Sequence, residues 1–245
     1  MRLVNAQYGL ILELGENKAN YLVIEEKQMR LKIIEELCQQ CLGEMGDFVL
    51  SYDNKILKMQ KTADILLSPL SIDCNNKKVL TKLYQDIKDC GNEDFYSEKE
   101  KINSEILLLF DKIMLNVPYN ITTTLDLDLV ELCKLYHVQL EEKGETLIER
   151  LIDYIQVMSQ LCGYRMFILL NFTMYLSREE LKSLYEFAAY QKIYLLLIEY
   201  FMPQLINDEK GCIIDEDGCI INIEKNNLQH LPGVTFGENQ DEFEV

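Results

Sequence analysis

Residues 166–199 read MFILLNFTMYLSREELKSLYEFAAYQKIYLLLIE, and this stretch decides the fold. It starts with a continuous apolar run that ends at Asn171, and it closes with a second run over residues 194–199. Between the two runs, Ser177 and Glu180 have the spacing of a capping box, and apolar residues then recur at helical intervals. Two buried strands joined by an amphipathic helix predict parallel neighbours in one sheet, as in the core of a nucleotide-binding α/β fold.

The residues that bind phosphate in such folds are missing from this sequence. A phosphate site needs a glycine-rich loop that ends in Lys followed by Ser or Thr, because its backbone N–H groups cradle the phosphates. No such loop occurs, and Asn171 stands at the strand end where nucleotide hydrolases carry a metal-binding acid. We therefore expect the skeleton of a nucleotide-binding protein without a bound nucleotide and without a catalytic step.

The composition indicates a globular protein with an acidic surface. At 245 residues with 48% apolar side chains, the chain can bury one sizeable core plus a smaller appendage. Its net charge of −17 argues against general binding to nucleic acids. Residues 55–82 are the exception, because six lysines there face only two aspartates. This segment is the candidate for binding an anion, although lysines beside sheet edges are also common on ordinary surfaces.

The first residues lack the features of a signal peptide, and polar residues interrupt both long apolar runs. We expect a cytoplasmic protein with no membrane segment. The eight cysteines are scattered at positions that suit apolar packing, so reduced thiols are favoured over disulfides. Cys38 and Cys41 form a CxxC inside an expected helix, and packing is favoured over zinc binding together with Cys212 and Cys219.

The amino-terminal part of the chain favours an α/β arrangement. A helical pattern covers residues 19–42, and another helix should begin near residues 73–76. Short apolar runs predict strands over residues 8–14, 48–52 and 65–70.

The middle of the chain carries two capped helices. The first follows a polar stretch over residues 89–97 and has Ser97 and Glu100 as its capping box, and the second runs from Thr146 to about Cys162. These patterns predict an α/β head formed by residues 1–92 and 161–245, with an α-helical leg inserted over residues 93–160.

A short repeat follows, in which residues 208–214 read DEKGCII and residues 215–221 read DEDGCII. It predicts two strands with tight turns. A calcium loop is disfavoured because the glycine has the wrong offset and no glutamate closes a twelve-residue loop.

Seven acidic residues gather where the helical leg is expected to fold back. They are Asp126, Asp128, Glu131, Glu141, Glu142, Glu145 and Glu149. Oxygen-rich side chains near a hinge are the ligands that calcium requires, but a solvated acidic helix face has the same composition. Both interpretations stay open on the residues alone.

Several segments, taken in order, resemble one protein family. They are YLVIEE at residues 21–26, ADILLS at 63–68 with SID at 71–73, LTKL at 80–83, MFILLN at 166–171 with LSREEL at 176–181, and PQ at 203–204 with DED at 215–217 and II at 220–221. In order and spacing they resemble the adaptation protein of type II-A CRISPR systems, a ring-forming protein that binds double-stranded DNA during spacer acquisition.

The resemblance implies a degenerate P-loop-ATPase-like head, an α-helical leg and a homotetramer. The ring would enclose a basic hole that accepts the linear ends of double-stranded DNA. It also implies a protein without enzymatic activity, whose partners include other CRISPR adaptation proteins and the RNA-guided effector nuclease.

The resemblance further implies two sets of site residues. Calcium near the junction of head and leg would be held by Asp126, Asp128, Glu131, Glu145 and Glu149, of which the last three match acids of the family, whereas Leu125 replaces one. DNA would contact Lys77, Lys78 and Lys82 first, followed by Arg30, Lys32, Lys58 and Lys61. Two alternatives remain: an adaptor that mainly binds other adaptation proteins, and a divergent nucleotide-binding protein.

Overall fold

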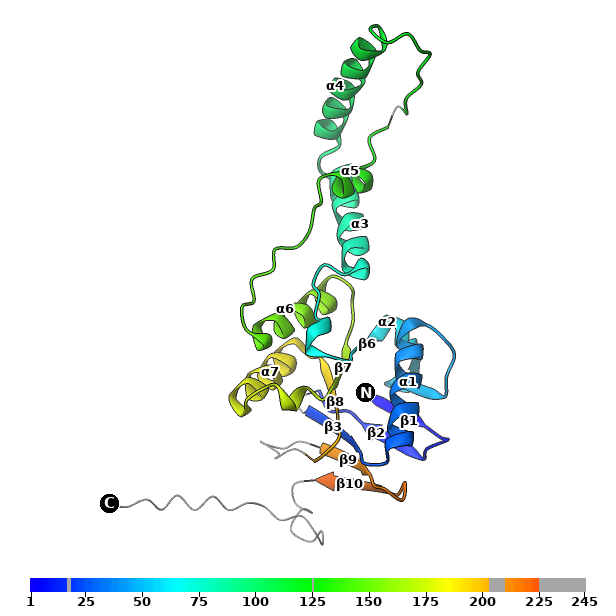
Figure 1. Cartoon of the computed structure of the whole chain (residues 1–245), viewed down its shortest axis with the longest axis vertical. Helices are drawn as coiled ribbons and strands as arrows, with labels where there is room; N and C mark the ends of the chain where they lie inside the picture. The colour runs from blue at the N-terminus through cyan, green and yellow to red at the C-terminus, as the bar shows by residue number, and fades with distance from the viewer. Residues whose placement is uncertain (17–18, 125, 203–209, 225–245) are drawn as a thin grey trace, which may run out of the picture. The chain divides into compact units, whose positions relative to one another are not determined.

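The computed structural model describes residues 1–16, 19–124, 126–202 and 210–224 (Figure 1). The chain divides into two compact units, Met1–Ser71 with Arg165–Val245, and Ile72–Tyr164. The first unit contains two β-sheets with helices between their strands, so the predicted α/β class is confirmed. The second unit contains the whole leg predicted over residues 93–160. It also contains the helix Lys77–Glu93, which the predicted boundary at residue 92 leaves almost entirely in the head.

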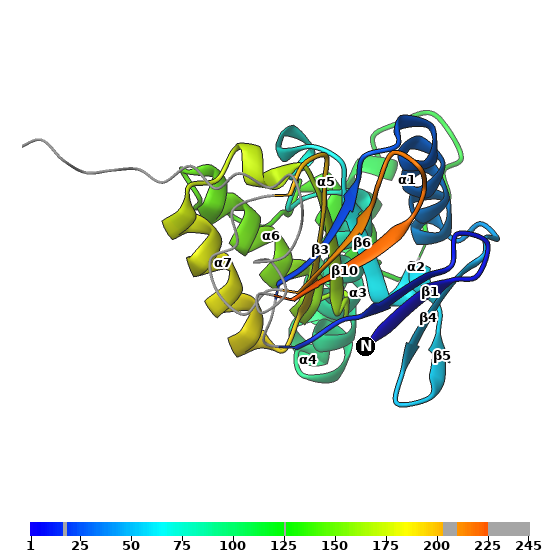
Figure 2. The same cartoon turned by 90° about the horizontal axis from the view of Figure 1, so that it is seen from below.

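The large sheet of the first unit has six strands in the order β10-β9-β3-β8-β7-β6. They are β3 (Ala19–Ile24), β6 (Ala63–Leu66), β7 (Met166–Leu170), β8 (Tyr194–Glu199), β9 (Lys210–Ile214) and β10 (Ile220–Glu224). All neighbours are parallel except β9 and β10, which form the antiparallel hairpin predicted from the repeat. Helices α1 (Lys27–Leu42) and α7 (Arg178–Gln191) lie on opposite sides of these strands (Figure 2).

The segment that decided the fold is confirmed. Strands β7 and β8 are parallel neighbours, with Leu170 opposite Ile198. Helix α7 joins them and begins with the predicted capping box, in which the Ser177 hydroxyl accepts from the Glu180 N–H and the Glu180 carboxylate accepts from the Ser177 N–H. Here local sequence and tertiary structure agree.

The helix predicted over residues 19–42 is wrong in its first part. Residues 19–24 form β3, and all six of its residues are buried. A strand covered on both faces shows no alternation of polar and apolar residues, so its pattern cannot be distinguished from that of a buried helix. The helix itself begins at Lys27 and ends before Gly43, which adopts a left-handed conformation with φ of 100°.

The small sheet is antiparallel, with the order β2-β1-β4-β5. Its strands are β1 (Arg2–Asn5), β2 (Leu10–Glu13), β4 (Phe48–Tyr52) and β5 (Lys55–Leu57). The prediction for 48–52 is confirmed, whereas the strand predicted over 8–14 is shorter. The strand predicted over 65–70 is observed as β6, which covers Ala63–Leu66. It cannot extend to residue 70, because a 3₁₀ turn starts at Pro69.

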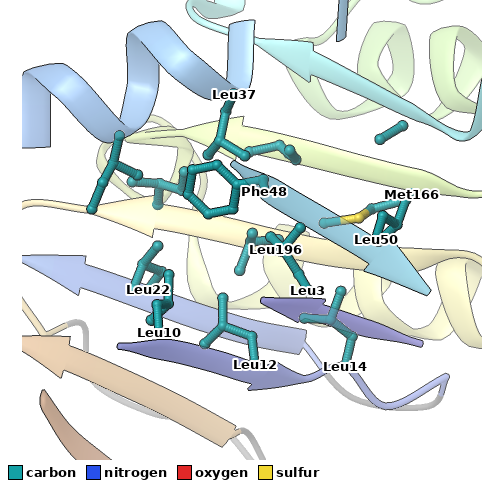
Figure 3. Close-up of a cluster of buried hydrophobic side chains, with 14 of the residues drawn as sticks. Leu3, Leu10, Leu12, Leu14, Leu22, Leu37, Phe48, Leu50, Met166 and Leu196 are labelled. Carbon is teal, nitrogen blue, oxygen red and sulfur yellow. The ribbon is translucent and has the colours of Figure 1, made fainter. Parts of the chain in front are cut away.

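The core of the first unit lies between the two sheets and α1. Leu3, Leu12 and Phe48 of the small sheet share one buried cluster with Leu22 and Leu196 of the large sheet, and Leu37 of α1 joins them (Figure 3). Alternate residues of β1 and β2 face this cluster, which is the period expected of strands buried on one side.

The second unit is helical among its described residues. Its helices are α3 (Lys77–Glu93), α4 (Tyr96–Met114), α5 (Leu129–Leu135) and α6 (Leu147–Gln160). Helices α3 and α5 approach closely at Gly91, where an added Cβ would lie 2.3 Å from Cδ1 of Leu129. The start predicted near residues 73–76 is confirmed, because Asn76 caps α3.

Of the two helix caps predicted in this unit, the one at Thr146 is confirmed. Thr146 and Glu149 exchange hydrogen bonds at the start of α6. The box predicted for Ser97 and Glu100 is wrong, because α4 already begins at Tyr96 and has no side-chain cap. Helix α3 continues through most of the polar stretch that was expected to separate the two helices.

Candidate nucleic-acid interface

The end of the central strand β3 is closed to phosphate by a side chain of the protein. Only Glu25 and Glu26 separate β3 from α1, at the place where nucleotide-binding folds carry their phosphate loop. The Glu26 carboxylate accepts hydrogen bonds from the backbone N–H groups of Gln28, at 2.9 Å, and Met29. These bonds lower the pKa of Glu26. An internal carboxylate therefore takes the donors that a phosphate would need.

Arg30 is held beside this helix start. Its guanidinium donates to the carbonyl oxygen of Ile24 at 3.2 Å and lies over the ring of Tyr200, 4.0 Å from the ring centroid. Arg30 was predicted to contact DNA. The structure places it at the carboxyl edge of the large sheet, with its side chain already stacked on an aromatic ring.

The neighbouring strand ends hold two further polar residues. Asn171 has a left-handed backbone with φ of 55°, and its N–H donates to the carbonyl oxygen of Ile198 at 2.9 Å. Glu199 is buried, which raises its pKa, and it accepts from the N–H of Thr173 at 3.2 Å. Oδ1 of Asn171 is the one fully buried side-chain oxygen or nitrogen without a hydrogen-bond partner in the described part of the chain.

The three lysines chosen first for DNA binding lie on the first two turns of α3. Lys77 and Lys78 directly follow the N-cap Asn76, and all three lysines are exposed. Nζ of Lys78 lies 5.3 Å from the ring centroid of Tyr164. Lys82 forms an ion pair of 2.8 Å with Asp86, and this contact raises the pKa of Lys82.

The position of these lysines costs the helix stability. The amino-terminal end of a helix carries partial positive charge, so cations there are unfavourable. The first turn of α3 itself contains no acidic residue. Phosphate groups bind favourably at such a helix end.

The other predicted DNA contacts lie in the first unit. Lys32 is exposed on α1. Lys58 is the N-cap of the short helix α2 (Met59–Thr62), and Lys61 lies in its last turn, where the N–H of Lys61 donates to the carbonyl oxygen of Lys58. With Arg30, these residues form a second basic set that belongs to a different compact unit from Lys77, Lys78 and Lys82.

Four of the five predicted calcium ligands already have a partner within the protein. Asp128 caps α5 through the N–H of Val130 at 2.8 Å, and this bond lowers the pKa of Asp128. Glu149 accepts from the N–H groups of Glu145 and Thr146 at 2.9 and 3.0 Å, which lowers its pKa as well.

Two of the other three acids of this set, Asp126 and Glu131, form ion pairs. Asp126 lies 3.3 Å from Lys99, and Glu131 lies 2.7 Å from Lys134. Within the described ranges, no group of three acidic, cysteine or histidine side chains is close enough to hold a metal ion. Calcium binding at these acids therefore stays a prediction.

The cysteines behave as packing residues where the structure describes them. Cys41 of α1 is buried and Cys38 is half-buried, and burial raises the pKa of the Cys38 thiol. On the β9–β10 hairpin Cys212 is buried and Cys219 exposed. All eight cysteines are free.

Sequence reasoning missed the exposure of α4. Its apolar residues form a helical stripe, yet Ile102, Leu109 and Ile113 are 49%, 56% and 45% exposed. The sequence showed the stripe itself. The structure shows that no helix or strand among the described residues covers it. None of the described helices is long and apolar enough to span a membrane.

Two known proteins are similar to this chain. A search of solved structures finds an ATP-binding cassette of an ABC transporter in its ADP conformation, with a TM-score of 0.45, 12% identity, and coverage of 90% of this chain and 88% of that one. A CRISPR-associated protein Csn2 from Streptococcus agalactiae is 23% identical over 211 residues, covering 82% of this chain and 92% of the relative.

The family model described as CRISPR-associated protein (Cas_Csn2) matches residues 40–218, which is most of the chain. The match includes α3 with its lysines, the whole helical unit and the segment from β7 to β8. The chain belongs to the Csn2 family of CRISPR-associated proteins, the adaptation proteins of type II-A systems.

Proposed function

We propose that this protein is a non-catalytic ring that binds the linear ends of double-stranded DNA during CRISPR spacer acquisition. Family membership supports a role in adaptation. The observation that carries DNA binding is the placement of Lys77 and Lys78 at the amino-terminal end of α3, where their charges oppose the helix dipole.

A ring would reconcile DNA binding with the acidic surface. One copy carries a net charge of −17, and three neighbouring exposed lysines give only a weak local field. Four copies around one hole would bring four such patches together, while the acidic exterior would repel DNA elsewhere. Affinity would come from phosphate neutralisation and would fall steeply with salt.

The apolar stripe of α4 supports self-association. Ile102, Ile106, Leu109 and Ile113 follow one another at intervals of four, three and four residues, which is the spacing of a coiled-coil seam. Ile102, Leu109 and Ile113 are each about half exposed. A helix from a second copy is the partner that such a seam fits best, and the proposed assembly is a homotetramer.

Calcium at the acidic residues of the second unit belongs to the same proposal. Carboxylates are suitable donors for calcium. To bind it, Asp126 would have to leave Lys99 and Glu131 would have to leave Lys134. The second pair is exposed on both sides and therefore weak, whereas the Lys99 side chain is only 11% exposed. Calcium binding would thus accompany a rearrangement of this region.

The test compares a linear duplex with a covalently closed circle of the same sequence at low salt, with calcium present. We expect capture of the linear form alone, since DNA would thread through a ring from its end. Lys77→Glu/Lys78→Glu/Lys82→Glu should abolish binding and leave the assembly intact. The control Lys101→Glu/Lys143→Glu/Lys182→Glu, which makes the same change in total charge, should retain binding.

Two results would contradict the proposal. Equal capture of both DNA forms would indicate an open surface patch in place of a ring. Absence of binding to either form would favour an adaptor that recognises other adaptation proteins or the effector nuclease through its acidic surface.

A further inference from the structure

The carboxyl edge of the large sheet exposes a group of aromatic side chains. Tyr175 follows β7 and is 59% exposed, while Tyr200 and Phe201 follow β8 and are 36% and 80% exposed. Exposed apolar side chains that lie together are a common feature of binding sites, whereas single exposed ones are ordinary. We call Tyr175, Tyr200, Phe201 and the adjoining Arg30 the aromatic edge.

Backbone contacts bring its two loops together. β7 and β8 are adjacent and parallel, and the N–H of Asn171 continues their pairing by donating to the carbonyl oxygen of Ile198. Two residues after Asn171 and one residue after Ile198, the N–H of Thr173 donates to the Glu199 carboxylate at 3.2 Å. The N–H of Tyr175 then bonds the carbonyl oxygen of Phe172 at 3.0 Å and fixes the turn. The loops of residues 172–175 and 199–201 therefore lie side by side.

The chemistry of this edge suits nucleobases. Tyr200 already stacks with a cation, since the Arg30 guanidinium lies 4.0 Å from its ring centroid. Aromatic rings and guanidinium planes are the groups on which unpaired bases stack, whatever the base sequence. Two acidic side chains nearby already accept hydrogen bonds from backbone N–H groups, Glu26 at the start of α1 and Glu180 at the start of α7.

We propose that the aromatic edge stacks on unpaired bases at the end of a DNA duplex. This inference rests on the proposed DNA-binding function and adds to it a preference for ends with exposed bases. Phosphate contacts by lysines cannot provide such a preference, because they are the same along the whole duplex. Stacking can, since an open or frayed end exposes both faces and the edges of its unpaired bases, whereas a blunt end exposes only one face of its last base pair.

The test uses two duplexes of one sequence, one blunt and one with a short unpaired overhang that carries 2-aminopurine, whose fluorescence is quenched by stacking. We expect the wild-type protein to quench the probe and to prefer the overhang. Phe201→Ala and Tyr175→Ala should each weaken overhang binding by about 5- to 100-fold, the range typical of one lost stacking contact. Both should still bind the blunt duplex.

Tyr190→Ala is the matched control, because Tyr190 is another exposed aromatic residue, on α7, that lies outside the aromatic edge. It should behave as wild type. Thermal unfolding of each variant checks that the fold is kept.

The possible results separate this inference from the proposed function. Unchanged quenching by Phe201→Ala and Tyr175→Ala, with blunt-duplex binding intact, would overturn the stacking role alone. Loss of binding to another adaptation protein, with DNA binding and quenching unchanged, would reassign the edge to a protein partner and overturn it as well. Failure of the wild-type protein to bind either duplex would overturn both proposals.

Discussion

The Glu26 carboxylate accepts a hydrogen bond of 2.9 Å from the N–H of Gln28, at the start of the helix that follows the central strand. A phosphate bound by a nucleotide-binding relative would use the same kind of donor. The protein therefore keeps the helix start of that fold, but the Glu26 carboxylate occupies the backbone N–H donors there.

Glu26→Gln is expected to lower the melting temperature at neutral pH, because it removes the charge that the helix start stabilises. Hydrogen bonds lower the pKa of Glu26 in the folded protein. Its contribution is therefore present above the unfolded value of about 4.3 and is lost as the pH falls through the folded value.

Urea unfolding of the wild type and Glu26→Gln across this acidic range checks the prediction. The two proteins should differ at neutral pH and converge in acid. The control is Glu25→Gln, since Glu25 is exposed and precedes the capping position. A loss of stability in Glu25→Gln equal to that in Glu26→Gln would show that capping is not the cause.

If the apolar stripe of α4 is the self-association surface, a charged residue in it should disrupt the proposed oligomer. Leu109→Glu should reduce the oligomer to smaller species, because a charge would enter an apolar seam. Helix content should stay unchanged, since Leu109 is 56% exposed in the single chain.

Light scattering after size exclusion measures the effect. Leu108→Glu is the matched control, because Leu108 is equally exposed on the same helix but lies off the seam. Identical masses for the wild type and Leu109→Glu would exclude α4 as the self-association surface.

Thiol reactivity should separate the cysteines by burial. Burial raises the pKa of Cys212 to about 11, so at pH 8 only about one molecule in a thousand carries its thiolate. Cys90 and Cys219 are exposed and should be alkylated first by iodoacetamide. Peptide mass spectrometry over time checks the order, and early labelling of Cys212 in the folded protein would contradict its burial.

The cluster between the two sheets predicts a large loss of stability for Leu196→Ala. Leu196 is fully buried in the cluster that joins both sheets and α1. Removing its side chain should lower the free energy of unfolding by about 2–5 kcal/mol. Chemical denaturation measures this change. Leu67→Ala, at a 48% exposed position, should have a much smaller effect.

Calcium is expected to raise the melting temperature if the acids of the second unit bind it, because a ligand that binds only the folded state stabilises it. Glu131→Gln should reduce this shift, since it removes a proposed ligand. The control Glu141→Gln changes a nearby exposed acid that lies outside the proposed ligand set. Equal calcium shifts in all three proteins would place the ion elsewhere, and no shift in the wild type would remove calcium from the proposal.

The amino-acid sequence by itself determined the elements whose signals are local. The β7–α7–β8 unit follows from two apolar runs and a capping box, and both depend on residues a few positions apart. The same holds for the cap at Thr146 and for the hairpin of the repeat. The missing phosphate loop and the lysines of α3 were also visible in the sequence, because they depend on residue identity alone.

Tertiary structure alone decided what depends on distant neighbours. β3 has a helical pattern and becomes a strand because β8 and β9 pair with it on both sides. Arg30 meets Tyr200 only because β3 and β8 are adjacent, and the aromatic edge exists only because β7 and β8 end together. Asp126, predicted as a calcium ligand, instead pairs with Lys99, which lies far from it in the sequence and could not be predicted from local spacing. Pairing and burial join residues far apart in the chain, and local patterns carry no information about which of them will meet.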